Sequence, residues 1–127
     1  PLDATQPVLG ATLVNIDRLS ESSRLGRIFA EQIATRMVQR GLRVTEVKLR
    51  ENLVLHREQG ELLLSREVRE VSQAQNAQAV VVGTYAVSAS ALYITLKLVN
   101  PVGNTVVAAT SYAVPVDENV RSLLNGR

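Results

Sequence analysis

The region between Gly60 and Tyr85 constrains the fold more than any other part of this chain, because a turn, a capped helix and a strand follow one another there. Ser65 precedes a segment with helical spacing of its apolar residues and is a typical N-cap. The run Ala79–Val82 has no polar member, which predicts a central strand covered on both faces. This strand is expected to end at Gly83. The region therefore predicts a helix that leads directly into the middle of a sheet.

A second, longer helix is predicted between Ser23 and Arg40. Ser20, followed by Glu21, suits the N-terminal end of this helix, and Ser22–Ser23 are expected to cap the helix rather than to bind an anion with Arg24 and Arg27. Gly41 is typical of the residue that ends a helix in the left-handed conformation. The apolar residues with helical spacing are Leu25, Ile28, Phe29, Ile33, Ala34, Met37 and Val38.

Alternation and turn signals predict the remaining elements. Residues 8–16 and 42–49 should form strands, and the first should place Leu9, Ala11, Leu13 and Asn15 on one face. Residues 51–61 are mostly polar and are expected to form a short helix or an irregular link. Strands are also predicted over residues 92–98 and 105–114, with a turn at 100–104, a short turn at 88–90 before them and a final helix over 117–124.

These elements predict an α+β fold in one domain that spans residues 1–127. Their order is β-α-β-α-β-β-β, which corresponds to a single mixed β-sheet of about five strands with two to three helices packed on it. One shared core is expected to contain Val80, Val82, Leu92, Ile94, Leu96, Ile28, Phe29 and Ile33.

Composition excludes several classes of protein. An apolar fraction of 46% excludes intrinsic disorder, and the lack of cysteine excludes disulfides and thiolate chemistry. No apolar run approaches the roughly 18 residues of a membrane-spanning helix. The chain begins at Pro1 rather than Met, which leaves room for a preceding signal peptide or lipidated cysteine.

Basic side chains outnumber acidic ones between residues 18 and 57, which is consistent with a basic face or with a solvated surface. A nucleic-acid binder would use Arg36, Arg40, Arg43, Lys48 and Arg50. A net charge of only +2, with one phenylalanine and three tyrosines, argues against that class.

No group of residues in the sequence has the pattern of a catalytic site. His56 is the single histidine, so neither a histidine base nor a zinc site has obvious companions. The pairs Glu58/Glu61 and Glu67/Glu70 stand beside arginines and are typical of surface ion pairs. We therefore expect no enzymatic activity and assign no catalytic, cofactor-binding or metal-binding residue.

Four blocks of residues carry a family resemblance. The third and fourth blocks, in tandem, are the most specific. The blocks are Ser22–Arg27, Gln39–Val44, Gly60–Glu67 and Ala79–Tyr85. With them the chain resembles the FlgO family of flagellum-associated outer-membrane proteins, a family similar in outline to the N-terminal domain of TolB and to CsgG-like lipoprotein domains.

The resemblance implies a non-enzymatic protein of the periplasm or outer membrane, without cofactors, that helps to build the outer-membrane part of the flagellum and supports motility. Its partners would be other envelope or flagellar ring proteins, or a second copy, but no nucleic acid; a membrane would be reached only through an N-terminal signal or lipid anchor. The alternative is a regulatory lipoprotein-type domain that binds a periplasmic partner such as a peptidoglycan synthase. Docking is expected either through Arg24, Arg27 and Arg36 on the first helix or through an open strand edge.

Overall fold

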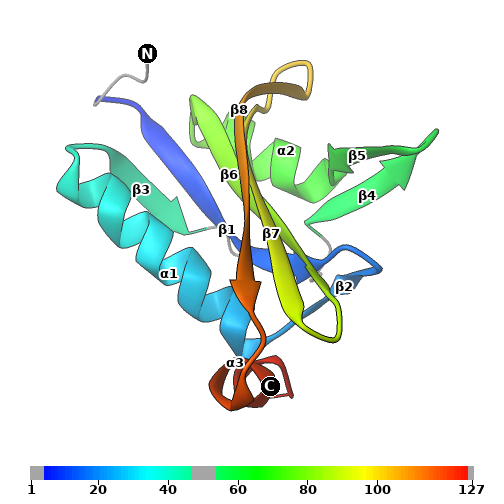
Figure 1. Ribbon diagram of the computed structural model, residues 1–127. Helices are drawn as coiled ribbons and strands as arrows, with labels where there is room; N and C mark the ends of the chain where they lie inside the picture. The colour runs from blue at the N-terminus through cyan, green and yellow to red at the C-terminus, as the bar shows by residue number, and fades with distance from the viewer. Residues whose placement is uncertain (1–4, 47–53, 126–127) are drawn as a thin grey trace.

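The computed structural model describes residues 5–46 and 54–125 of the chain. These residues form three helices and eight strands, in the order β1-β2-α1-β3-β4-β5-α2-β6-β7-β8-α3 (Figure 1). The predicted α+β class is confirmed. Among the described residues, no helix has the length and apolar character needed to cross a bilayer.

The main sheet has six strands, in the order β2-β1-β6-β7-β8, with β3 also paired to β1. It is mixed, as predicted: β1 is parallel to β3 and β6, whereas the pairs β1–β2, β6–β7 and β7–β8 are antiparallel. Its strands are β1 (Pro7–Asn15), β2 (Arg18–Ser22), β3 (Arg43–Glu46), β6 (Ala79–Val87), β7 (Ala91–Asn100) and β8 (Thr105–Pro115).

Helix α1 (Arg24–Gln39) begins directly after Ser23, so the capping role expected of Ser22–Ser23 is confirmed for Ser23. The Oγ of Ser23 accepts a hydrogen bond from the Gly26 amide at 3.2 Å, so Ser23 is the N-cap. The prediction for Ser20 is wrong because Ser20 lies in β2, an additional short strand that pairs with β1. The C-terminal prediction is confirmed, since Gly41 follows the helix with a φ of +88°.

The other two helices begin as the sequence predicts. Helix α2 (Arg66–Ala74) is capped by Ser65, whose Oγ accepts from the Val68 amide at 3.3 Å. Helix α3 (Glu118–Asn125) is capped by Asp117, whose Oδ1 accepts from the Val120 amide at 2.9 Å.

Strands β4 (Leu55–Glu58) and β5 (Glu61–Leu64) form a hairpin where we expected a short helix or an irregular link. Gln59 and Gly60 connect them with φ values of 53° and 82°. A two-residue turn with both φ values positive has the twist that antiparallel strands require. The end of the predicted second strand (residues 47–49) and the start of the predicted link (residues 51–53) lie outside the described residues.

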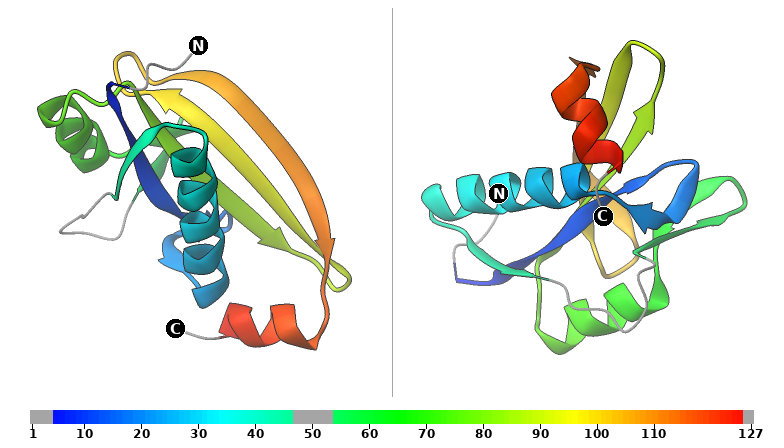
Figure 2. Two further views of the ribbon diagram at one scale, coloured as in Figure 1. Left: turned by 90° about the vertical axis from the view of Figure 1, so that its left-hand side faces the viewer. Right: turned by 90° about the horizontal axis from the view of Figure 1, so that it is seen from below.

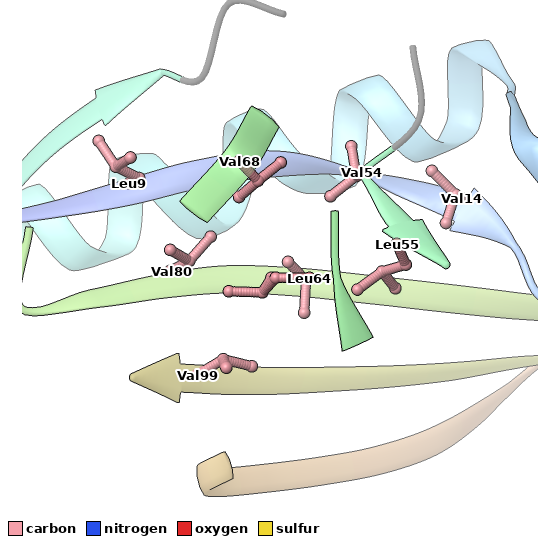
Figure 3. Packing of buried hydrophobic residues seen from close by; sticks show 9 residues of the cluster. Leu9, Val14, Val54, Leu55, Leu64, Val68, Val80 and Val99 are labelled. Atoms are coloured by element: carbon pink, nitrogen blue, oxygen red, sulfur yellow. The ribbon is translucent and has the colours of Figure 1, made fainter. Parts of the chain in front are cut away.

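The core is divided between the two faces of the sheet, not gathered on one. Helices α1 and α3 lie on one face, and α2 lies on the other with the β4–β5 hairpin (Figures 1 and 2). The α2-side cluster contains Leu9, Val14, Val54, Leu55, Leu64, Val68, Val80, Val82 and Val99 (Figure 3). The α1-side cluster contains Leu13, Leu25, Tyr85, Leu92 and Ile94, with Phe29, Ile33 and Leu96 packed against it.

The prediction of a single core is therefore wrong, because its residues are divided between two clusters. Val80 and Val82 lie in the α2-side cluster, away from Leu92 and Ile94, because β6 is central and sends alternate residues to opposite faces. Ile28 is only half-buried and lines a shallow polar hollow on the outer surface of α1.

Leu13 lies where α1, β1 and β6 come closest. A Cβ added to Gly26 would lie 2.5 Å from the carbonyl oxygen of Leu13, and one added to Gly83 would lie 2.6 Å from its Cγ. Gly83 therefore does not end the strand as predicted; β6 continues to Val87, and the glycine makes room for Leu13. Leu9 and Leu13 were expected on one face, but a register shift between Gly10 and Leu13 turns them to opposite clusters.

Candidate interaction surface

The histidine and the glutamates considered as candidates for catalysis or metal binding do not gather at one site. The Nε2 of His56 lies 3.6 Å from a carboxylate oxygen of Glu58 on β4, and these two side chains are 33% and 65% exposed. The Nε of Arg66 lies 2.9 Å from Glu70 Oε1, an exposed ion pair across one helical turn. Within residues 5–46 and 54–125, no three histidine, aspartate or glutamate side chains are placed to hold a metal ion.

The two hollows beside the sheet are smaller than the polar hollow on the outer surface of α1, which has about 560 Å³ and is open to solvent. The hollow between the β4–β5 hairpin and strands β6–β8 encloses about 20 Å³, enough for one or two water molecules but not for a metabolite. The groove between α1 and strands β7–β8 is an open apolar depression of about 210 Å³. Its lining is mostly apolar and includes Met37, Leu96, Leu98, Ala108 and Thr110, together with the charged residue Lys97. This shape suits side chains of another protein better than an enclosed small molecule.

Strand β8 is exposed along almost its whole length. It forms the outer rim, where no further strand of the described chain pairs with it (Figure 2, left). Nearly all of its residues are exposed, including Val106, Val107 and Tyr112 at 46%, 55% and 41%. No charged residue occurs between Lys97 and Asp117, so this rim has no charge of its own. A long, uncharged, uncovered strand is the kind of edge on which other strands pair.

The hydrogen bonds at the end of β8 show which of its backbone groups face outward. The amide of Val116 donates to the carbonyl of Ser90 at 3.1 Å, so this amide points toward β7. Successive residues of a strand direct their backbone groups to alternate edges. The N–H and C=O groups of Ala109, Ser111 and Ala113 therefore point away from β7, toward the open rim.

The opposite border of the sheet is built differently. Strands β2 and β3 share the outer edge of β1, at its two ends. They have five and four residues, and each contains an arginine and a glutamate. Short length and charged side chains discourage pairing with foreign strands. Of these borders, only β8 offers a long unprotected edge.

The three arginines proposed for docking are all exposed on α1 but do not form one patch. Arg27 and Arg36 are nine positions apart, and at about 100° per residue they project from opposite sides of the helix. Arg24 lies between these two directions. The expected arginine-rich side is therefore not present as a single surface, and a role for each arginine remains a prediction.

The open edge was expected from the sequence, but its position was not. The absence of charge from Leu98 to Val116 is the sequence signal that singles out this strand, although its place at the border of the sheet follows only from the strand order. An edge strand that faces only water would carry lysine or other charged residues.

Several solved structures share this fold. PelC from Paraburkholderia phytofirmans, solved as a dodecamer, matches with a TM-score of 0.60 and 14% identity over 97% of this chain and 83% of that one. The LpoB C-terminal domain from Escherichia coli matches with a TM-score of 0.55 and 16% identity over 84% and 81%. The lipoprotein GNA1162 from Neisseria meningitidis gives 0.54 and 12% over 89% and 82%.

A comparison with curated protein sequences finds no match. The family model described as FlgO protein matches residues 1–119, which contain all four blocks that carry the resemblance. This match covers nearly the whole chain and includes the glycines that pack against Leu13. The chain belongs to the FlgO family.

Proposed function

We propose that this chain is a non-enzymatic domain of the bacterial envelope that acts by docking on other proteins. Its site of action is the outer-membrane part of the flagellum, where it supports assembly and motility. The observation that carries the proposal is the FlgO family match over residues 1–119.

Two features of the molecule support docking over catalysis. The described residues include no cluster of metal-binding side chains, and the enclosed hollow is too small for a metabolite. The rim of β8 is a long unprotected edge that offers backbone hydrogen-bonding groups beside an apolar groove. One solved protein of this fold is a dodecamer, so the fold is compatible with assembly between subunits.

A second candidate function is that of a regulatory, lipoprotein-type domain. In this role the domain would bind a periplasmic partner such as a peptidoglycan synthase and alter its activity. The similarity to the LpoB C-terminal domain and to the lipoprotein GNA1162 supports this candidate through the fold.

Deletion of the gene separates the two candidates. The flagellar function predicts reduced swimming and incomplete basal structures by electron cryotomography, with normal wall synthesis. The regulatory function predicts altered peptidoglycan synthesis and sensitivity to wall-directed antibiotics, with intact flagella. A deletion strain that swims normally and builds intact basal structures would refute the flagellar assignment. Fractionation of the full-length protein should place it in the periplasm or outer membrane.

Complementation of the deletion strain tests the arginines. Charge reversal at Arg24, Arg27 and Arg36, singly and together, should impair swimming if α1 contributes to docking. Full rescue by the triple variant would remove α1 as a docking site and leave the strand edge.

A further inference from the structure

We propose that β8 pairs antiparallel with β8 of a second copy of this chain, through a two-fold axis at Ser111. The inference rests on the proposed function, because it names the partner and the surface of a domain that acts by docking. It joins two six-stranded sheets edge to edge.

The chemistry of the edge favours a second copy as the partner. A strand that adds to β8 must satisfy outward backbone groups without bringing a charge against an uncharged rim. Of the border strands of the six-stranded sheet, β2 and β3 are too short and carry charged residues, as do the four-residue strands of the β4–β5 hairpin, whereas β8 has eleven residues without charge. Pairing of β8 with its own copy is free of charge repulsion and forms a closed two-fold dimer, the commonest symmetric assembly.

The position of the axis follows from the limits of the regular edge. A register shift between Leu98 and Val99 interrupts the β7–β8 ladder near Val107, and Pro115 has no N–H to donate. Ala109, Ser111 and Ala113 are the outward-facing residues between these limits. They are symmetric about Ser111, so an axis there pairs Ser111 with its own copy and Ala109 with Ala113.

The same register places larger side chains of one copy opposite smaller side chains of the other. In an antiparallel pair, residues directly opposite each other share a face. Tyr112 of one copy then lies opposite Thr110 of the other, and Val114 lies opposite Ala108. Thr110 and Ala108 line the apolar groove beside α1, so the second copy would cover a surface that is now exposed. On the other face, β8 itself would contribute the small side chains of Ala109, Ser111 and Ala113, and Lys97 of β7 lies directly opposite Ala109.

Two substitutions test the pairing with the purified chain by light scattering and sedimentation over a concentration series. Ser111→Lys would place two like charges at the axis and should raise the dimer dissociation constant about tenfold or more. Ser111→Pro removes an outward N–H, and proline is tolerated at an edge, so the dimer should be lost while the melting temperature stays close to that of the wild type. Ala89→Lys, in the exposed β6–β7 turn, is the matched control and should leave the dimer intact.

Cysteine cross-linking locates the axis. The chain has no cysteine, so each single-cysteine variant reports on its own position. Ser111→Cys should form a disulfide-linked dimer, Ala109→Cys and Ala113→Cys should form much less, and Ala89→Cys should form none. The same variants in the full-length protein test the contact in cells.

A wild-type chain that remains monomeric at all concentrations, or a dimer that Ser111→Lys and Ser111→Pro leave unchanged, would overturn the proposal. A monomer whose Ser111→Lys variant loses motility would also overturn it, in favour of a strand from another protein. The light-scattering, sedimentation and cross-linking results do not depend on the deletion phenotype, so failure of the pairing and failure of the flagellar assignment are distinguishable.

Discussion

Replacement of Gly83 by alanine should destabilise the domain through a collision with Leu13. The new methyl carbon would lie 2.6 Å from Leu13 Cγ and 2.9 Å from its Cδ1, and Leu13 is only 2% exposed. Overpacking of a core typically costs about 1–3 kcal/mol, from which alanine recovers about 0.5–1 kcal/mol relative to glycine in a strand. We expect a net loss of roughly 1–2 kcal/mol in the free energy of unfolding.

The double variant isolates the collision from other effects. Leu13→Ala alone should cost about 2–5 kcal/mol, because it leaves a cavity between α1 and the sheet. In that background the methyl group at position 83 enters vacated space, so Gly83→Ala should cost close to nothing. The pair should therefore show a coupling of roughly 1–2 kcal/mol.

Gly26→Ala is the matched control because its clash is with the backbone of Leu13. The added Cβ would lie 2.5 Å from the Leu13 carbonyl oxygen, which Leu13→Ala does not remove. Its cost should therefore be the same in both backgrounds. Urea denaturation followed by circular dichroism measures all these variants. A cost for Gly83→Ala that is as large in the Leu13→Ala background as in the wild type would refute the packing explanation.

Four further results are expected. Phe29→Ala should lower the free energy of unfolding by about 2 kcal/mol, less than the roughly 3–5 kcal/mol of a fully buried phenylalanine, because Phe29 is half-buried against the α1-side cluster. Val38→Ala, at 56% exposure, should lower it by less than about 0.5 kcal/mol. Equal losses for the two variants would mean that the face of α1 assigned to the core is wrong. Ser65→Ala should cost about 1 kcal/mol in denaturant unfolding, through loss of the cap on α2. Leu64→Ala should cost about 2–5 kcal/mol, since Leu64 is 1% exposed and anchors β5 to the sheet; a loss below about 1 kcal/mol would mean that the hairpin is not part of the core. Protein purified without chelators should hold no stoichiometric zinc by elemental analysis, and zinc that His56→Ala abolishes would contradict this.

Features fixed by local chemistry could be predicted from the sequence. Ser65 caps a helix and Gly41 ends one because their side-chain and backbone preferences act within a few residues. The run Ala79–Val82 reveals a central strand because only burial on both faces explains it. The β4–β5 hairpin was missed because Gln59-Gly60 is a weaker turn signal than Asn-Gly and its first strand is polar.

Features that depend on pairing between distant segments could not be predicted. The division of the core follows from the central position of β6, and the reversal of Leu13 follows from a register shift in β1. Which strand lies at the rim likewise depends on the order of the strands in the sheet. Composition marks β8 as uncharged, but only the topology shows that this uncharged strand has one open side.

Swimming of the deletion strain carrying Ser111→Lys, compared with the strain carrying Ala89→Lys, tests whether this domain functions through the rim of β8. Both variants add one lysine at an exposed position, and immunoblotting confirms equal amounts of protein. We predict that Ala89→Lys restores the swimming zone of the wild type and that Ser111→Lys leaves it at the size of the deletion strain. Equal and full rescue by both variants would contradict the assignment of function to this edge.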